Sequence, residues 1–506
     1  MAGTFNTINY QKYTYTGFGP LLSNQSFQHT APWANFGMEY YGRIPRQPVG
    51  NVQSHPEYGQ IARSWNQTYK ALSAAADGLR VIEDDADLAA ELGDNKVQRL
   101  KAYAKFIQGT GHGMLALAYA RGFVVDETTD LAEPQDAVDY NTMMEAALGY
   151  LDDAIALAGP GFGDQEPIPS QWMSVQVRSD ELIEIAHSYK ARFRANVART
   201  PAERAAVDWA AVIADVDAGL QADWEMLLGA DNGWHASGLR YSAIPGWSEM
   251  NYYINGMADQ SGNYQRWLAQ PLSERHPAPA GEDPILIMTD DLRFPQGADV
   301  ATQKANPGTM YAIPCEDTEG NPAACEDTNW SISNVWARPD RGSWRWSYYW
   351  HTETADYAAL IQELWPEITH DEMRLLKAEG LYRQGGQEAT VAQMINVTRE
   401  AAGLNATDAA GTNTSCVPKL ADGTCGDLFE MLKWEKRQQT FFKGAFIAPW
   451  YFDGRGWGDL YEGTPLHYPI PCGDVQVLQL PSGCLTYGGD PSAEFSSPGS
   501  VYNFES

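Results

Sequence analysis

The sequence predicts a protein dominated by α-helices, in which two blocks of paired helices flank a long loop-rich region. In residues 61–221 and 351–464, apolar side chains recur every three or four positions, the period of an amphipathic helix. Residues 222–350 lose this period and are rich in Gly, Pro, Asn, Asp and aromatic residues. We expect an extended segment over residues 1–60, and irregular structure with short strands over 465–506.

The N-terminal block contains five predicted helices. In the first, over residues 61–84, Trp65, Leu72 and Leu79 lie at seven-residue steps on one face. The others are expected at 96–121, 141–158, 180–198 and from Pro201 onward, the last as one helix that includes Trp209, Ile213 and Val216. Short turns between them indicate successive antiparallel pairs, the layout of tetratricopeptide-type units, although no strict repeat of that length is present.

The second of these helices includes the glycine string Gly109, Gly111 and Gly113, with His112 among them. Small residues within a helix let a neighbouring helix approach closely, so we interpret this string as a packing feature and not as a phosphate loop. We predict that His112 is a packed core residue and not a ligand.

The C-terminal block is predicted to contain four helices. They are expected at residues 353–364, 370–384, 388–402 and 427–442.

The charge of the chain limits its partners. The formal net charge is −30, and both nucleic acid and anionic lipid need a basic face, so neither is expected as a ligand. The 17 Trp and 26 Tyr suit instead stacking on sugar faces, peptide grooves or protein interfaces.

The six cysteines fall into three close couples, each with turn-forming residues between its members. Zinc sites need more closely spaced Cys and His sets, so disulfides are favoured over metal ligation and over free thiols. Disulfides indicate an oxidising compartment. The expected pairs are Cys315 with Cys325, Cys416 with Cys425, and Cys472 with Cys484.

Four segments, in order, resemble the SusD/RagB family of substrate-binding lipoproteins. The strongest is residues 373–404, with an acid-bearing helix, a Gly turn and an Ile-Asn…Arg…Ala-Gly-Leu ending. The others are Ala102–Gly109 continuing to Leu115–Tyr119, Tyr189–Phe193, and Trp434–Arg437 followed by Gly458–Leu460 and Tyr468–Pro471.

The resemblance implies an α-α superhelix of the SusD type at the outer membrane, exposed on the cell surface. It also implies a non-enzymatic role, in which the protein works with a SusC-like TonB-dependent transporter and binds an oligosaccharide or a peptide. The family is anchored through a lipidated cysteine near the mature N-terminus, whereas the first cysteine here is Cys315. No export signal is recognisable at Met1–Asn6, so the expected location rests on the family and on the cysteines.

The aromatic residues of the middle region are the candidates for ligand contact. Alternation in an extended segment places Trp344, Trp346 and Tyr348 on one face, where flat rings suit the apolar faces of sugars. Arginines beside them suit hydroxyl or carboxylate groups. The alternative is that the rings fill the core. The further candidates are Arg341, Arg345, Trp336, Trp247 and Tyr252.

Other functions are less favoured by the sequence. There is no Gly-x-Ser-x-Gly elbow and no His-Glu-x-x-His helix, so a hydrolase is the weakest alternative. The main alternative is a structural protein that self-associates into a surface layer or filament through its aromatic residues. No cofactor is expected; the acidic run Glu83–Asp87 suits calcium, but it matches no regular loop spacing, and a solvated helix end is favoured.

Overall fold

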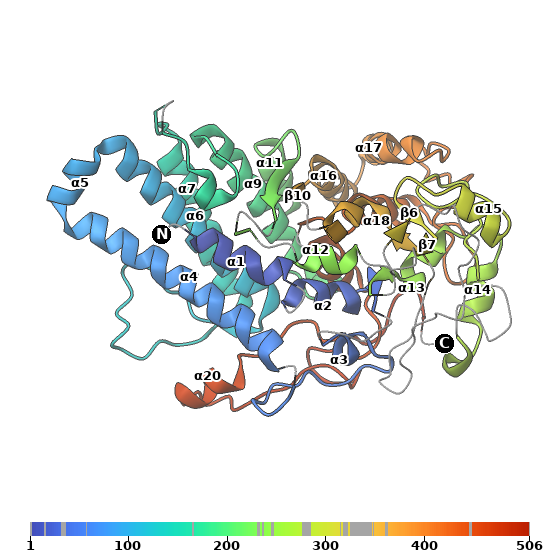
Figure 1. Ribbon diagram of the computed structural model, residues 1–506, viewed down its shortest axis with the longest axis horizontal. Coiled ribbons are helices and arrows are strands. Elements are labelled where there is room, and N and C mark those ends of the chain that lie inside the picture. Colours follow the sequence, from blue (N-terminus) through green and yellow to red (C-terminus); the bar gives the residue numbers. More distant parts are fainter. Residues whose placement is uncertain are drawn as a thin grey trace.

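The protein is mainly helical, and its strands form only short two-stranded antiparallel sheets. This confirms the predicted fold class. Figure 1 shows an elongated molecule with the first long helices at one end and α14 and α15 at the other. The computed structural model describes residues 3–14, 17–31, 37–56, 58–163, 166–229, 233–234, 237–243, 247–275, 285–313, 315–316, 322–323, 347, 349–359, 363–444 and 448–504.

The first four helices predicted for the N-terminal block are present, and their bounds differ from the predicted ones by a few residues. The single helix predicted from Pro201 onward is wrong, because the helical run ends at Ala205 and a new helix begins at Trp209. Asp208 starts this second helix as its N-cap and accepts a hydrogen bond from the Ala211 N–H at 3.0 Å. Each packs on its neighbours: α6 on α4 and α7, α7 on α9, and α9 on α11. This is the expected packing of successive helix pairs. The helices are α4 (Tyr58–Asp84), α6 (Asp94–Ala118), α7 (Tyr140–Ala158), α9 (Ser179–Asn196), α10 (Pro201–Ala205) and α11 (Trp209–Asp217).

The glycine string of α6 allows close helix packing, as predicted. A Cβ atom at Gly109 would lie 2.6 Å from the Leu151 side chain, and one at Gly113 would lie 2.1 Å from Phe193. His112 is fully buried beside them, and its Nε2 accepts a hydrogen bond from the Val125 N–H at 3.1 Å. The His112 ring is therefore a neutral residue of the core, and its proton is on Nδ1.

The acidic run between α4 and α6 forms the end of one helix and the start of another. Glu83 and Asp84 close α4, and Asp85 accepts a hydrogen bond from the Leu88 N–H at 2.9 Å as the N-cap of α5 (Ala86–Leu92). Helix α5 was not predicted from the sequence, because a helix of seven residues gives too short a periodic signal.

Residues 1–60 correct one expectation, because they contain three helices where an extended segment was predicted. These are α1 (Thr4–Tyr13), α2 (Phe18–Gln25) and α3 (Met38–Gly42). Helix α1 looks polar, but its Lys12 is buried and lies 2.7 Å from the Glu367 carboxylate. The partner of Lys12 is more than 350 positions away in the sequence, so no local pattern of apolar residues predicts this helix.

The helix predicted at residues 353–364 is wrong. The chain forms a 3₁₀ segment over Thr352–Ala359 and then β10 (Glu363–Ile368), which pairs antiparallel with β4 (Trp224–Leu228). Along β10 the exposed Leu364 is followed by the buried Trp365, the alternation of a strand. The partner strand is remote in sequence, so the local apolar spacing was misleading.

The remaining helices of the C-terminal block agree with the prediction. They are α16 (His370–Gln384), α17 (Glu388–Ala401) and α18 (Leu428–Gln439), which share a small apolar core. Short elements fill the rest of the chain: α8 (Ser170–Met173), α12 (Ser237–Ser242), α13 (Tyr252–Asn255), α14 (Asn263–Leu268), α15 (Val300–Ala305), α19 (Gly454–Trp457) and α20 (Cys472–Val477). The other paired strands are β1 (His29–Thr30) with β5 (Glu249–Met250), β2 (Arg121–Gly122) with β3 (Val138–Asp139), β6 (Tyr311–Ala312) with β9 (Trp350–His351), and β7 (Cys315–Glu316) with β8 (Pro322–Ala323).

Two of the three predicted disulfides are present. Cys416 pairs with Cys425, and Cys472 pairs with Cys484. The predicted pair of Cys315 with Cys325 falls outside the described residues, because Cys325 and the Cys315 side chain are not among them.

Helix α18 buries several charged side chains. The Glu435 carboxylate accepts hydrogen bonds from Arg293 Nη1 at 2.8 Å and Nη2 at 3.1 Å, and Asp291 accepts a second pair from the same guanidinium. The indole N–H of Trp434 also donates to Asp291 at 3.3 Å. These bonds fasten the loop-rich region to the C-terminal block.

The next residue of α18 connects the C-terminal block to the N-terminal block. Lys436 lies 2.8 Å from Asp453, which also lies 2.7 Å from Arg204 at the start of the N-terminal block's last helix pair. Arg204 in turn holds Glu379 at 2.6 Å. Burial alone would raise the pKa of Glu379, but the Arg204 guanidinium lowers it to about 2, so the carboxylate stays charged.

Four buried histidines predict that the protein loses stability on mild acidification. Burial lowers the pKa of His29 to about 3 and that of His112 to about 4, and it also lowers the pKa of His351 and His467. Below about pH 6.5 these histidines take up protons in the unfolded chain but not in the folded protein. The free energy of unfolding therefore decreases as the pH is lowered. We expect urea denaturation to show a loss of roughly 1 kcal/mol per pH unit for each histidine between about pH 6 and 5. A free energy of unfolding that stays constant over this range would contradict the burial of these neutral rings.

Candidate functional site

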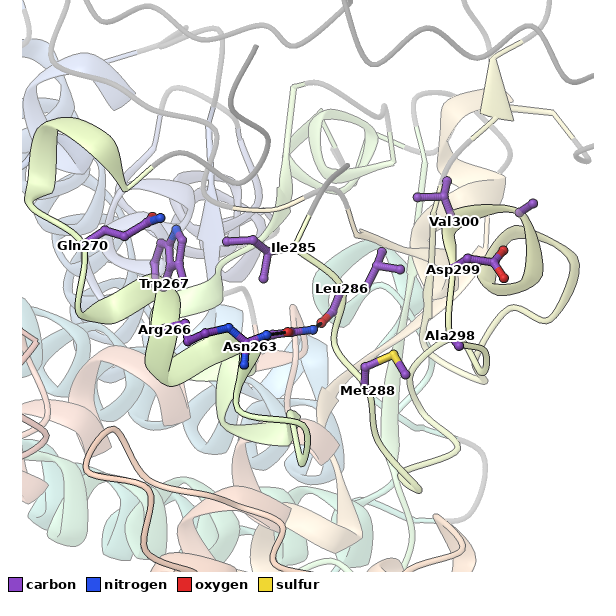
Figure 2. Close-up of a pocket in the computed structure, with 11 residues that line it drawn as sticks. Asn263, Arg266, Trp267, Gln270, Ile285, Leu286, Met288, Ala298, Asp299 and Val300 are labelled. Atoms are coloured by element: carbon purple, nitrogen blue, oxygen red, sulfur yellow. Dashed lines mark hydrogen bonds between the residues drawn. The ribbon is translucent and has the colours of Figure 1, made fainter. Parts of the chain in front are cut away.

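A cavity of about 640 Å³ lies in the loop-rich region, between α14, the segment 285–288 and the start of α15. Figure 2 shows Asn263 and Arg266 of α14 on one side of it and Val300 of α15 on the other. Its lining residues are Asn263, Arg266, Trp267, Gln270, Ile285, Leu286, Met288, Ala298, Asp299, Val300 and Ala301.

A buried aspartate positions α14. Asp259 accepts hydrogen bonds from the backbone N–H groups of Gly262 at 2.9 Å and Tyr264 at 3.1 Å, and from the Ser261 hydroxyl at 2.8 Å. Gly262 has a φ of 91°, in the left-handed region that favours glycine. Asp259 also accepts from the Met288 N–H at 2.9 Å, so one carboxylate joins α14 to the opposite wall.

The wall 285–288 is held from behind by buried side chains. The Tyr252 hydroxyl donates to the Ile285 carbonyl, and the Ile287 N–H donates to the Tyr349 hydroxyl at 2.9 Å. Gln303 of α15 donates to the Ile287 carbonyl at 2.9 Å and accepts from the Tyr349 hydroxyl at 2.6 Å. Burial raises the pKa of Tyr349 above its usual value, so this hydroxyl keeps the proton that it donates.

The polar groups of the cavity lie mainly on α14. Asn263 donates to the Leu286 carbonyl at 2.9 Å and accepts a hydrogen bond from the Arg266 guanidinium. Arg266 is exposed, so most of its donors face solvent and are free to meet a ligand. Gln270, one turn further on, adds an amide at the same side.

The α15 side carries one carboxylate among the described lining residues. Asp299 is the N-cap of α15 and accepts from the Thr302 N–H at 2.8 Å and the Thr302 hydroxyl at 3.0 Å. These bonds lower the pKa of Asp299, so the group is ionised at neutral pH. The rest of the lining on this side is aliphatic.

This arrangement suits the binding of a small ligand. Apolar side chains face amide and guanidinium donors across a cavity of the size that holds small ligands. Glycosidase chemistry needs two carboxylates across the bond that is cleaved, and the described lining offers one, which already caps a helix. In the described part of the chain, no group of three His, Cys, Asp or Glu side chains is placed to hold a metal ion.

The predicted ligand residues are only partly placed by the structure. Tyr252 is buried, and we assign it to the support of the cavity wall. Trp247 is half-buried, and its ring lies 6.2 Å from that of Tyr241, away from the lining set. The other six lie outside the described residues: Trp336, Arg341, Trp344, Arg345, Trp346 and Tyr348.

Sequence reasoning missed Asn263, Arg266, Gln270 and Asp299, because it followed aromatic density alone. The one local signal was Asp299 three residues before Thr302, a helix-capping pattern that marks a structural position and carries no sign of a ligand.

Comparison with known proteins places the fold. No family model and no curated protein matches the sequence. Among solved structures, a SusD homolog from Parabacteroides distasonis is 14% identical, with 90% of this chain and 83% of that chain covered and a TM-score of 0.53. A SusD superfamily protein from the same species is 12% identical, with 94% and 97% covered and a TM-score of 0.53. A SusD/RagB family protein from Bacteroides thetaiotaomicron is 14% identical, with 94% of each chain covered and a TM-score of 0.51.

At these identities the likeness shows the fold. The chain has a SusD-like fold over most of its length, which confirms the structural part of the resemblance drawn from the four sequence segments.

If Asp259 joins the two walls of the cavity, its substitution should lower the free energy of unfolding much more than substitution of the nearby Asp290. Asp259→Ala leaves buried N–H groups without an acceptor, so we expect urea denaturation to show a loss of about 2–4 kcal/mol. The matched control is Asp290→Ala, an exposed carboxylate near the same loop that accepts a single bond, from Gln260 at 3.2 Å. Its effect should be below about 0.5 kcal/mol. Equal losses for the two variants would show that Asp259 does not join the two walls.

Proposed function

We propose that this protein is a non-enzymatic nutrient-binding protein of the SusD/RagB type, which captures an oligosaccharide or a peptide at the outer surface of the outer membrane. It would pass that ligand to a SusC-like TonB-dependent transporter. The observation that carries the proposal is the cavity between α14 and α15, set in a SusD-like fold.

The lining of the cavity supports a ligand with both apolar faces and polar edges. Ile285, Leu286 and Met288 offer an aliphatic surface for the C–H faces of sugar rings, and Arg266 with Asn263 offers donors for hydroxyl or carbonyl oxygens. The same set suits a peptide, whose carbonyl groups also need donors. The abundance of Trp in the chain favours a glycan, and this preference is part of the proposal.

The proposed location is supported by two features. The two disulfides favour an oxidising compartment. The second feature is the SusD-like fold, from which we infer a position at the cell surface and a transporter partner. None of the helices in the described ranges has the length and apolar character that crossing a membrane requires.

The cavity can be tested by filling it. Ala298 lines the cavity and is exposed, so Ala298→Trp should block the cavity without disturbing the core. We expect glycan and peptide arrays to identify a ligand that the parent protein binds, and calorimetry to show that Ala298→Trp weakens its binding by about tenfold or more. The control is Val477→Trp, which adds the same ring at a side chain that is 80% exposed on α20. Unchanged affinity in Ala298→Trp would exclude this cavity as the binding site.

The predicted aromatic contacts need a separate measurement. Trp344→Ala and Trp346→Ala should each weaken binding of the same ligand, because a ring stacked on a sugar or a side chain is lost. If the ligand binds and neither change weakens it, the two rings belong to the core or to another surface.

A further inference from the structure

A second hollow lies at the opposite end of the molecule from the candidate site. Its volume is about 590 Å³, and it lies where α4, α5 and α6 meet, the end at which α5 projects in Figure 1. We call it the tip groove. Apart from a single aspartate its lining is apolar, with Val81, Ile82, Leu88, Leu92, Leu100 and Trp172 as the main side chains.

The tip groove exposes apolar surface that the fold itself does not cover. None of the seven residues of α5 is buried, although Leu88 and Leu92, one turn apart, both line the groove. The Val81 side chain on α4 is 53% exposed. A short helix is normally held by burying its apolar face, but here Leu88 and Leu92 stay only partly buried against α4 and α6, so part of this face is uncovered in the described chain.

The residues around the tip groove are mainly acidic, and the basic residues among them form ion pairs with carboxylates. Residues 77–101 contain seven Asp or Glu and four Lys or Arg. Each of the four cations pairs with a carboxylate, as in Arg80 with Asp77 at 2.7 Å and Lys101 with Glu83 at 3.1 Å.

Besides Asp85, which caps α5, four exposed carboxylates are left over near the groove. They flank its lining residues in the sequence and have no cation within ion-pair distance among the described residues: Asp84, Asp87, Glu91 and Asp94.

We propose that the tip groove binds an amphipathic segment of a partner protein, which places apolar side chains between α4 and α5 and Lys or Arg side chains against the surrounding carboxylates. Charge complementarity selects this occupant. A second copy of a chain with net charge −30 would bring like charges together, and an anionic lipid surface would be repelled by the same carboxylates. This surface lies apart from the ligand cavity, so the inference does not depend on the proposed function.

The test uses the whole protein and a defined probe. The probe is a labelled amphipathic helical peptide of about 18 residues made of Leu and Lys, and its counterpart carries Glu in place of Lys. Val81→Glu removes an apolar contact and adds a negative charge, so it weakens binding only if the apolar groove is used. The control Val477→Glu adds the same charge at an exposed position on α20.

We expect fluorescence anisotropy to show that the Leu/Lys peptide binds the parent and Val477→Glu alike, and that Val81→Glu weakens binding about tenfold. Changing Asp84, Asp87 and Asp94 to Asn and Glu91 to Gln should weaken binding and reduce its dependence on salt. Binding that is equal or tighter in Val81→Glu would overturn the proposal, as would equal binding of the Leu/Glu peptide. Dimerisation through the groove, or binding to vesicles of phosphatidylglycerol that Val81→Glu abolishes, would also overturn it.

Discussion

The buried charges of α18 are the constraint on which the rest of the structure depends. A charged side chain is costly to bury unless a partner of opposite charge is buried with it. The partners of α18 come from two other parts of the chain: Arg293 from the loop-rich region, and Asp453 and Asp459 from the segment that follows the helix. Asp453 in turn reaches Arg204 of the N-terminal block. The helix is therefore stable in its buried position only when both helical blocks and the middle region are assembled around it.

The candidate cavity depends on the same helix. Arg293 lies five residues after Met288, the last lining residue of the wall, and its backbone carbonyl accepts hydrogen bonds from Met310 and Tyr311. A Cβ atom at Gly308 would lie 2.2 Å from that carbonyl, so only glycine allows the two segments to meet. The wall is thus fixed at its start by Tyr252, Tyr349 and Asp259, and beyond its end by the α18 charges. A rigid wall lets the side chains of α14 and α15 stay in place before a ligand arrives.

The sequence predicted most of the long helices, because each carries its own apolar stripe over several turns. It also predicted the helix α18, whose charged residues Glu435, Lys436 and Arg437 belong to one of the four recognised segments. Two of the disulfides were predicted as well, because their cysteines are close along the chain. It missed α1, whose buried Lys12 needs Glu367, and it took part of β10 for a helix, because the partner strand β4 is remote. The cavity was not predicted from the sequence either, because Asp259 and Met288 come together only in the folded chain and no local pattern links them.

The most direct test of this account is hydrogen exchange at the cavity wall in Glu435→Gln. Loss of the charge leaves Arg293 without its second carboxylate partner and costs roughly 3 kcal/mol. We expect the amides of Ile287 and Met288 to exchange about a hundredfold faster, while amides of α9 change much less. The control is Glu400→Gln, an exposed carboxylate on α17, which should change neither. Equal acceleration in α9 and the wall, or an unchanged wall, would contradict the claim that the charges of α18 hold the cavity in place.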